Sequence, residues 1–162
     1  EYDRYLTDLC GMIAASRKLN VIFLCTGNSC RSQMAEGWAR ALLSDVCVAY
    51  SAGVEEHGMN PMAVRVMQEA GVDITDQFSK TIDGLPKIDI DIVVTVCDHA
   101  RESCPVLPGA KLTLHRNFED PPRLAAGLDD EQAVRIYRRV RDDIRDYVEG
   151  LPAYFETVRL ER

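Results

Sequence analysis

Residues 21–32 restrict the fold more than any other part of this sequence. The first four are apolar and predict a buried strand, and the next eight, Cys-Thr-Gly-Asn-Ser-Cys-Arg-Ser, predict a loop that begins with a thiol. From residue 32 to residue 43, apolar side chains recur at helical spacing and predict a helix that packs on a sheet. A strand, short loop and amphipathic helix in succession indicate an α/β fold.

The loop predicts an oxyanion site beside a reactive cysteine. Inward-facing backbone N–H groups and the N-terminus of the following helix bind a tetrahedral anion, and their positive field favours the thiolate of Cys25. Gly27 supplies the φ freedom of a tight loop, Arg31 binds two oxygens of the anion, and Ser32 can hydrogen-bond the thiolate. The alternative is a buried structural cysteine before an ordinary turn, which the Cys-five-residues-Arg spacing disfavours. The candidate oxyanion-binding residues are Thr26, Gly27, Asn28, Ser29, Cys30, Arg31 and Ser32.

The rest of the chain continues the strand and helix alternation. A central four-stranded parallel sheet flanked by helices, in three layers, is therefore expected. An amphipathic helical extension is expected at residues 1–19, before one domain at residues 20–162. Cys47 is expected to be a buried small hydrophobe, and Cys10 to serve packing. Strands are predicted at residues 46–53, 88–96 and 111–114, and helices at 61–71 and 129–148. A loop is predicted at 73–80 with a short helix after it, Asp-Pro-Pro at 120–122 closes the region after the last strand, and residues 151–162 form a helical or frayed tail.

Charge and cysteine usage narrow the class of protein. A net charge of −7 argues against nucleic acid or an anionic membrane as the main partner. The sequence has no apolar run of membrane-spanning length and does not open like a signal peptide, so a soluble cytoplasmic protein is expected. In that setting six cysteines indicate catalytic or redox thiols. They lack paired Cys-two-residues-Cys spacing, so neither a metal nor another cofactor is expected.

A second informative stretch begins at Cys97, where the predicted strand 88–96 ends. The carboxyl ends of parallel strands lie at one edge of a sheet, so Cys97 should lie at the same edge as Cys25. Cys104 follows after six intervening residues on a polar segment. Two thiols on such a segment can exchange disulfide partners if the segment moves. The alternative is a pair of incidental thiols.

The loop, Cys25-Thr-Gly-Asn-Ser-Cys-Arg-Ser, resembles the phosphate loop of low-molecular-weight tyrosine phosphatases, and most closely that of the thioredoxin-coupled arsenate reductases built on the same fold. The resemblance covers roughly residues 20–150 and includes Tyr-Ser-Ala-Gly at 50–53, Asn-Pro at 60–61 and Asp-Pro at 120–121, in family order. Phosphatases of this fold need the loop cysteine, the arginine and an acid. The similar reductases carry two further cysteines at the places of Cys97 and Cys104.

The resemblance implies a relay of three thiols. Arsenate binds against Arg31, Cys25 attacks arsenic, and Asp120 protonates the departing oxygen. Cys97 then attacks Cys25 and expels arsenite, and Cys104 attacks Cys97 to leave a Cys97–Cys104 disulfide that thioredoxin reduces. Cys30 could form a protective disulfide with Cys25 outside this path.

Three other functions stay open. The chain could be a low-molecular-weight tyrosine phosphatase, a reductase that uses mycothiol or glutathione, or a protein that only binds the anion. Some reductases of the family hold potassium with groups that correspond to Asn28, Glu36, Ser51 and an aspartate where this chain has Lys80. The lysine ammonium can replace the ion and removes a carboxylate ligand from it, so no potassium dependence is expected.

Overall fold

A computed structural model describes residue 4 and residues 17–103, 107 and 109–160 of the chain. The expected N-terminal extension lies almost entirely outside these residues, as do Cys10 and Cys104. The elements are β1 Leu19–Cys25, α2 Arg31–Leu42, β2 Cys47–Gly53, α3 Pro61–Glu69, the 3-10 helix η1 Ile82–Gly84, β3 Ile92–Thr95, α4 Asp98–Ser103, β4 Leu112–His115, α5 Pro121–Ala125, α6 Asp130–Glu149 and α7 Pro152–Leu160.

The strands form one parallel sheet in the order β2-β1-β3-β4, which confirms the predicted α/β architecture. β1 is paired on both sides, with Leu24 opposite Thr95 of β3 and Cys25 opposite Gly53 of β2. Strands buried on both faces have continuous apolar sequences, which explains why residues 21–24 and 92–94 were recognisable. The register also brings the ends of β1 and β3 together at the carboxyl edge of the sheet.

One predicted strand boundary is wrong for a local reason. The strand expected at residues 88–96 begins only at Ile92, because the buried Asp91 carboxylate accepts hydrogen bonds from Arg17 and from the backbone N–H of Asn20. The Asp-Pro-Pro segment begins α5, in which Pro121 takes the first helical position, where its missing N–H costs nothing.

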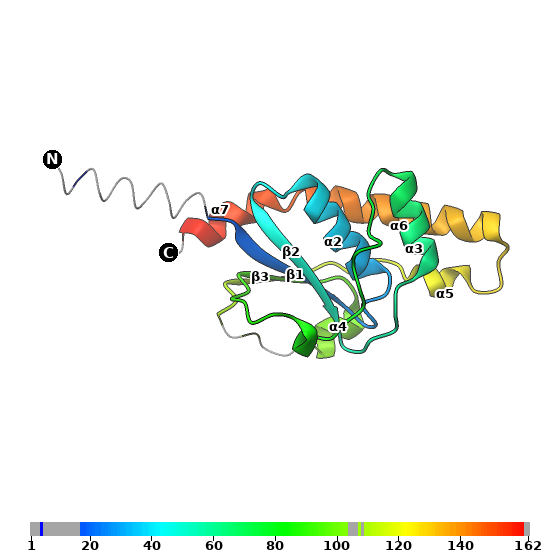
Figure 1. Cartoon of the computed structure of the whole chain (residues 1–162), viewed down its shortest axis with the longest axis horizontal. Helices are drawn as coiled ribbons and strands as arrows, with labels where there is room; N and C mark the ends of the chain where they lie inside the picture. The colour runs from blue at the N-terminus through cyan, green and yellow to red at the C-terminus, as the bar shows by residue number, and fades with distance from the viewer. Residues whose placement is uncertain (1–3, 5–16, 104–106, 108, 161–162) are drawn as a thin grey trace.

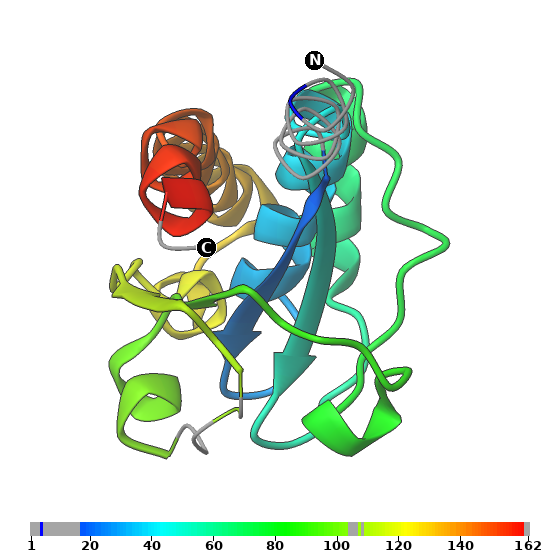
Figure 2. The ribbon, with the colours of Figure 1, turned by 90° about the vertical axis from the view of Figure 1, so that its left-hand side faces the viewer.

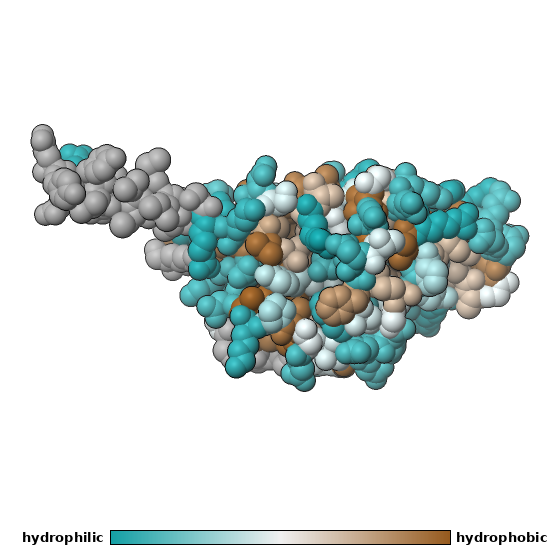
Figure 3. Space-filling model, in the orientation of Figure 1, coloured by the Kyte–Doolittle hydropathy of each residue, from teal (hydrophilic) through white to brown (hydrophobic). Residues whose placement is uncertain are grey.

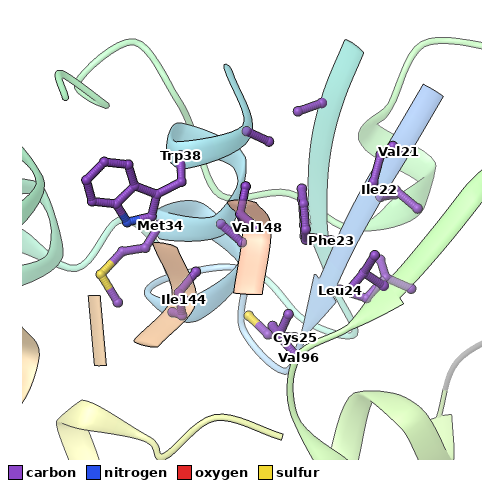
Figure 4. Packing of buried hydrophobic residues seen from close by; sticks show 14 of the residues in the cluster. Val21, Ile22, Phe23, Leu24, Cys25, Met34, Trp38, Val96, Ile144 and Val148 are labelled. Carbon is purple, nitrogen blue, oxygen red and sulfur yellow. The ribbon is translucent and has the colours of Figure 1, made fainter. Parts of the chain in front are cut away.

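Helices cover both faces of the sheet, as Figures 1 and 2 show from two directions: α2, α3, α6 and α7 lie on one side and α4 on the other. Figure 4 shows Met34 and Trp38 of α2 and Ile144 and Val148 of α6, which belong to the same buried hydrophobic cluster as the residues of β1. Cys25 ends its buried strand in contact with this core. The thiol is therefore held by a close-packed scaffold.

The surface seen in Figure 3 is mainly hydrophilic, and its hydrophobic residues form separate small patches. Among the large hydrophobic residues of the described chain, Phe78 is one of the more exposed, with 60% of its surface accessible. Isolated exposed hydrophobic side chains are ordinary and by themselves define no binding face. Among the described residues, no helix has both the length and the apolar composition needed to cross a membrane.

Candidate active site

The loop between β1 and α2 is held in shape by two residues in different ways. Asn28 adopts a left-handed conformation with φ of 48°, which asparagine tolerates better than most residues. The prediction that Gly27 supplies this freedom is therefore wrong. Gly27 is needed for another reason, since a Cβ atom there would collide with the ring of His57, which lies against the loop.

A chain of buried hydrogen bonds leads to the sulfur of Cys25. The backbone N–H of Lys80 donates to Asn28 Oδ1 at 3.0 Å, which fixes the orientation of the Asn28 amide. Asn28 Nδ2 then donates to Ser32 Oγ at 2.8 Å. Because this oxygen accepts from Asn28, the Ser32 hydroxyl is placed to donate its own proton to Cys25 Sγ, 2.8 Å away. Such a bond stabilises a thiolate, as the sequence predicted.

The anion cavity over the loop has a volume of about 350 Å³. Arg31 and Asp120 both line it, with Arg31 Nη2 3.7 Å from Asp120 Oδ1. Arg31 Nη1 donates to the carbonyl of Phe118 at 3.0 Å, and the guanidinium is largely buried. The structure therefore brings together the predicted thiol, cation and acid. The cavity is lined by Cys25, Thr26, Gly27, Ser29, Cys30, Arg31, His57, Asn60, Asp120 and Pro122.

A layer of buried polar side chains hydrogen-bonds to the loop and holds it in place, and sequence patterns did not indicate most of these residues. Gln33 Nε2 donates to the carbonyl oxygens of Asn28 and Phe78, each at 3.0 Å, and to Asn28 Oδ1 at 2.9 Å. Gln77 Nε2 donates to Gln33 Oε1 at 2.9 Å, and Lys80 Nζ donates to the Phe78 carbonyl at 3.0 Å. These bonds join the loop to α2 and to the segment at residues 73–80.

Lys80 brings a positive charge into this layer. Burial raises the pKa of the Glu36 carboxyl and lowers the pKa of the Lys80 ammonium, while the charge of each partner opposes the shift of the other. Ser51 Oγ also donates to Glu36, at 3.3 Å. The Lys80 ammonium, which donates to the Phe78 carbonyl, thus places a positive charge where the resemblance indicated a potassium site.

Cys97 lies where the sequence placed it, directly beyond β3 and beside the loop. Its Sγ is 3.4 Å from Thr26 Oγ1 and accepts the backbone N–H of Ala100 at 3.3 Å. A second cavity, of about 540 Å³, opens over Cys97, and Thr26, Arg31 and Asp120 line it as well as the anion cavity. The anion site and the second thiol are therefore contiguous.

The remaining described thiols are buried. Burial raises the pKa of Cys30, and the neighbouring Cys25 raises it further. Burial also raises the pKa of Cys47 to about 11, in agreement with its predicted role as a small hydrophobe. Cys104 lies outside the described residues, so its predicted role stays a prediction. In the part of the chain that the structure describes, His, Cys, Asp and Glu form no cluster of three or more suited to a metal ion.

Comparison with known proteins gives concordant results. Residues 20–161 match the family model for low molecular weight phosphotyrosine protein phosphatase. An arsenate reductase of Halalkalibacterium halodurans is 52% identical over 124 residues, covering 76% of this chain and 88% of the relative. One of Bacillus subtilis is 49% identical over the same shares.

Solved structures similar to this chain include both arsenate reductases and a phosphatase. A structure described as an arsenate reductase in the phosphate binding state aligns with a TM-score of 0.67 and 33% identity, covering 85% of this chain and 98% of that one. A low molecular weight protein tyrosine phosphatase from T. tengcongensis aligns with a TM-score of 0.63 and 25% identity, over 85% and 99% of the two chains.

Proposed function

Because the chain belongs to the low molecular weight phosphotyrosine protein phosphatase family and groups with its arsenate reductases, we propose that it reduces arsenate to arsenite through a relay of three thiols. The observation that carries the relay is the 3.4 Å contact between Cys97 Sγ and the hydroxyl of Thr26, the residue after Cys25. Hydrolysis of a phosphoester needs no second thiol at this place. Transfer of two electrons to arsenic does.

The first step uses the anion cavity. Arsenate accepts hydrogen bonds from the loop N–H groups and from Arg31, and the Cys25 thiolate attacks arsenic. Asp120 donates a proton to the oxygen that leaves, which departs as water. The hydroxyl of Ser32 and the guanidinium of Arg31 support this step, since both stabilise negative charge in a largely buried site.

The second step forms a disulfide and reduces arsenic. The Cys97 thiolate attacks the sulfur of Cys25, the sulfur–arsenic bond breaks, and its electron pair stays on arsenic. As(V) thereby becomes As(III) and leaves as arsenite, while the two thiols are oxidised to a disulfide. The parallel register supports this pairing, because β1 and β3 are neighbours and end at the same edge of the sheet.

In the third step, the Cys104 thiolate attacks Cys97 and releases Cys25, which leaves a Cys97–Cys104 disulfide for thioredoxin to reduce. This step needs movement of the segment between the two thiols. Among the residues of α4, only Ala100 is buried, whereas α2 buries eight, so α4 is anchored far more lightly. We place the reaction in the cytoplasm, where thiols are kept reduced.

The test is arsenate-dependent oxidation of NADPH in the presence of thioredoxin and thioredoxin reductase. Repeated turnover by the wild type, and at most one turnover by Cys104→Ser, would support the relay. Equal turnover by both proteins would show that thioredoxin reduces the Cys25–Cys97 disulfide without Cys104. Turnover only when mycothiol or glutathione and its reductase replace the thioredoxin system would make a small thiol the electron source. Reduction by neither protein, with hydrolysis of p-nitrophenyl phosphate intact, would make the chain a phosphatase.

A further inference from the structure

Two hydrogen-bond contacts link the second thiol to a histidine. Thr26 Oγ1 lies 3.4 Å from Cys97 Sγ and 3.1 Å from His99 Nδ1. The hydroxyl therefore stands between a thiol that must lose its proton and an imidazole nitrogen that can accept one.

We propose that His99 accepts the proton of the Cys97 thiol through the hydroxyl of Thr26, an inference that rests on the proposed function. His99 contacts Thr26, which lines the anion cavity, but no contact joins it to the thiol itself, so it is a positioning residue that acts through Thr26. The contacts permit a continuous donor order: Cys97 S–H donates to Thr26 Oγ1, and the Thr26 O–H donates to His99 Nδ1. This order requires the His99 tautomer that carries its proton on Nε2.

The transfer is balanced and involves no change of oxidation state. The thiol proton moves to Thr26 Oγ1 while the hydroxyl proton moves to His99 Nδ1, so threonine is regenerated, sulfur becomes thiolate and the imidazole becomes imidazolium. The backbone N–H of Ala100 already donates to Cys97 Sγ, which favours the charged product. The thiolate is then the nucleophile that the second step requires.

The surroundings leave His99 free for this role. The nearest carboxylate in the sequence, Asp98, accepts from His115 Nε2 at 2.7 Å instead, and His115 Nδ1 is 2.7 Å from Thr95 Oγ1. His99 itself is exposed at the cavity over Cys97, from which water can carry its proton away. The charged groups that share this cavity or the same helix with His99 are Arg31, Asp98, Arg101, Glu102, Glu119, Asp120 and Arg123.

The experiment measures the thiolate of Cys97 directly. In a protein with Cys25→Ser and Cys104→Ser, iodoacetamide alkylation of Cys97 is followed by mass spectrometry across the titration range of histidine. Adding His99→Asn to this protein keeps a side chain that can hydrogen-bond to Thr26 but removes the imidazole, the base that takes up the proton. We expect alkylation near neutral pH to slow about 10- to 100-fold and to lose its dependence on histidine titration. Glu102→Gln, on the same helix, should leave the profile unchanged.

Substitution of the bridging residue tests the route. Thr26→Ser retains the hydroxyl and should preserve the pH profile, whereas Thr26→Val should reproduce that of His99→Asn. An unchanged profile in His99→Asn, or in Thr26→Val, would overturn the proposal. Because alkylation needs no arsenate, its outcome is independent of whether the protein reduces arsenate.

Discussion

Replacing Ser32 with alanine should remove most of the reactivity of Cys25. The backbone N–H of Lys80 can only donate, so it fixes the Asn28 amide with Oδ1 toward Lys80 and Nδ2 toward Ser32. Because the Ser32 oxygen accepts from Nδ2, the Ser32 proton is directed at the sulfur of Cys25. A hydrogen bond to a charged group contributes about 1.5–3 kcal/mol, so its loss should reduce the population of reactive thiolate about 10- to 150-fold.

The assay is the rate of Cys25 alkylation by iodoacetamide at neutral pH, with turnover of p-nitrophenyl phosphate measured beside it. Ser32→Ala also leaves Asn28 Nδ2 without this acceptor, which should lower the free energy of unfolding by about 1–3 kcal/mol. Rates are therefore compared well below the melting temperature of the variant. Ser44→Ala makes the same change at an exposed serine and serves as the control, while Ser32→Thr restores the hydroxyl.

A folded Ser32→Ala protein with wild-type alkylation and turnover would refute this reasoning. The Ser32 hydroxyl would then be a structural link to Asn28 alone. Loss of reactivity in Ser32→Ala, together with retained reactivity in Ser32→Thr, would support the reasoning. Both variants alter the same buried site, but only Ser32→Ala removes the hydroxyl that donates to the sulfur.

Three further predictions follow from residues around the loop. Between the ordinary carboxyl pKa of 4.5 and the raised pKa of Glu36, the unfolded chain has lost a proton that the folded chain keeps, so stability should fall as pH rises through this window. Denaturant titrations of Glu36→Gln should lack this fall. Exchange of potassium for sodium at fixed ionic strength should leave turnover unchanged, since Lys80 supplies the cation; a large specific loss would contradict this. In Gly53→Ala the new Cβ would lie 2.7 Å from the backbone nitrogen of Asn28, so the loop must shift and turnover should fall about 100-fold, whereas Gly150→Ala, 3.5 Å from its nearest neighbour, should be nearly silent.

The elements of this fold that follow local sequence patterns could be predicted from the sequence. Apolar runs indicate the two central strands, and the rule that parallel strands end at one edge predicts that Cys25 and Cys97 lie together, as they do. The conformation of Asn28 was missed, because glycine is the residue expected at positive φ and only the packing of His57 shows what Gly27 is for.

The buried polar layer could not be predicted for a different reason. Gln33 has the appearance of a polar helix residue and Gln77 that of a loop residue, and both types are mostly exposed in proteins. They are buried here because their amides satisfy one another and the loop backbone across 44 or more positions of sequence. Neither periodicity nor motif spacing carries that information, since it depends on where residues 73–80 return to the loop.

The way the two halves of the site are anchored suits the two kinds of chemistry proposed for it. Binding an oxyanion and holding a thiolate require donors that do not move, and the buried amides of Gln33 and Gln77 hold the loop to α2. Disulfide transfer requires the opposite, a segment whose displacement disturbs little, and α4 buries only Ala100 among its residues. The buried amides contact the loop on the α2 side, whereas Cys97 contacts it through Thr26. We therefore expect a movement of α4 to break the Thr26 contacts without displacing the buried amides, so that the proposed oxyanion site stays formed during the proposed thiol relay.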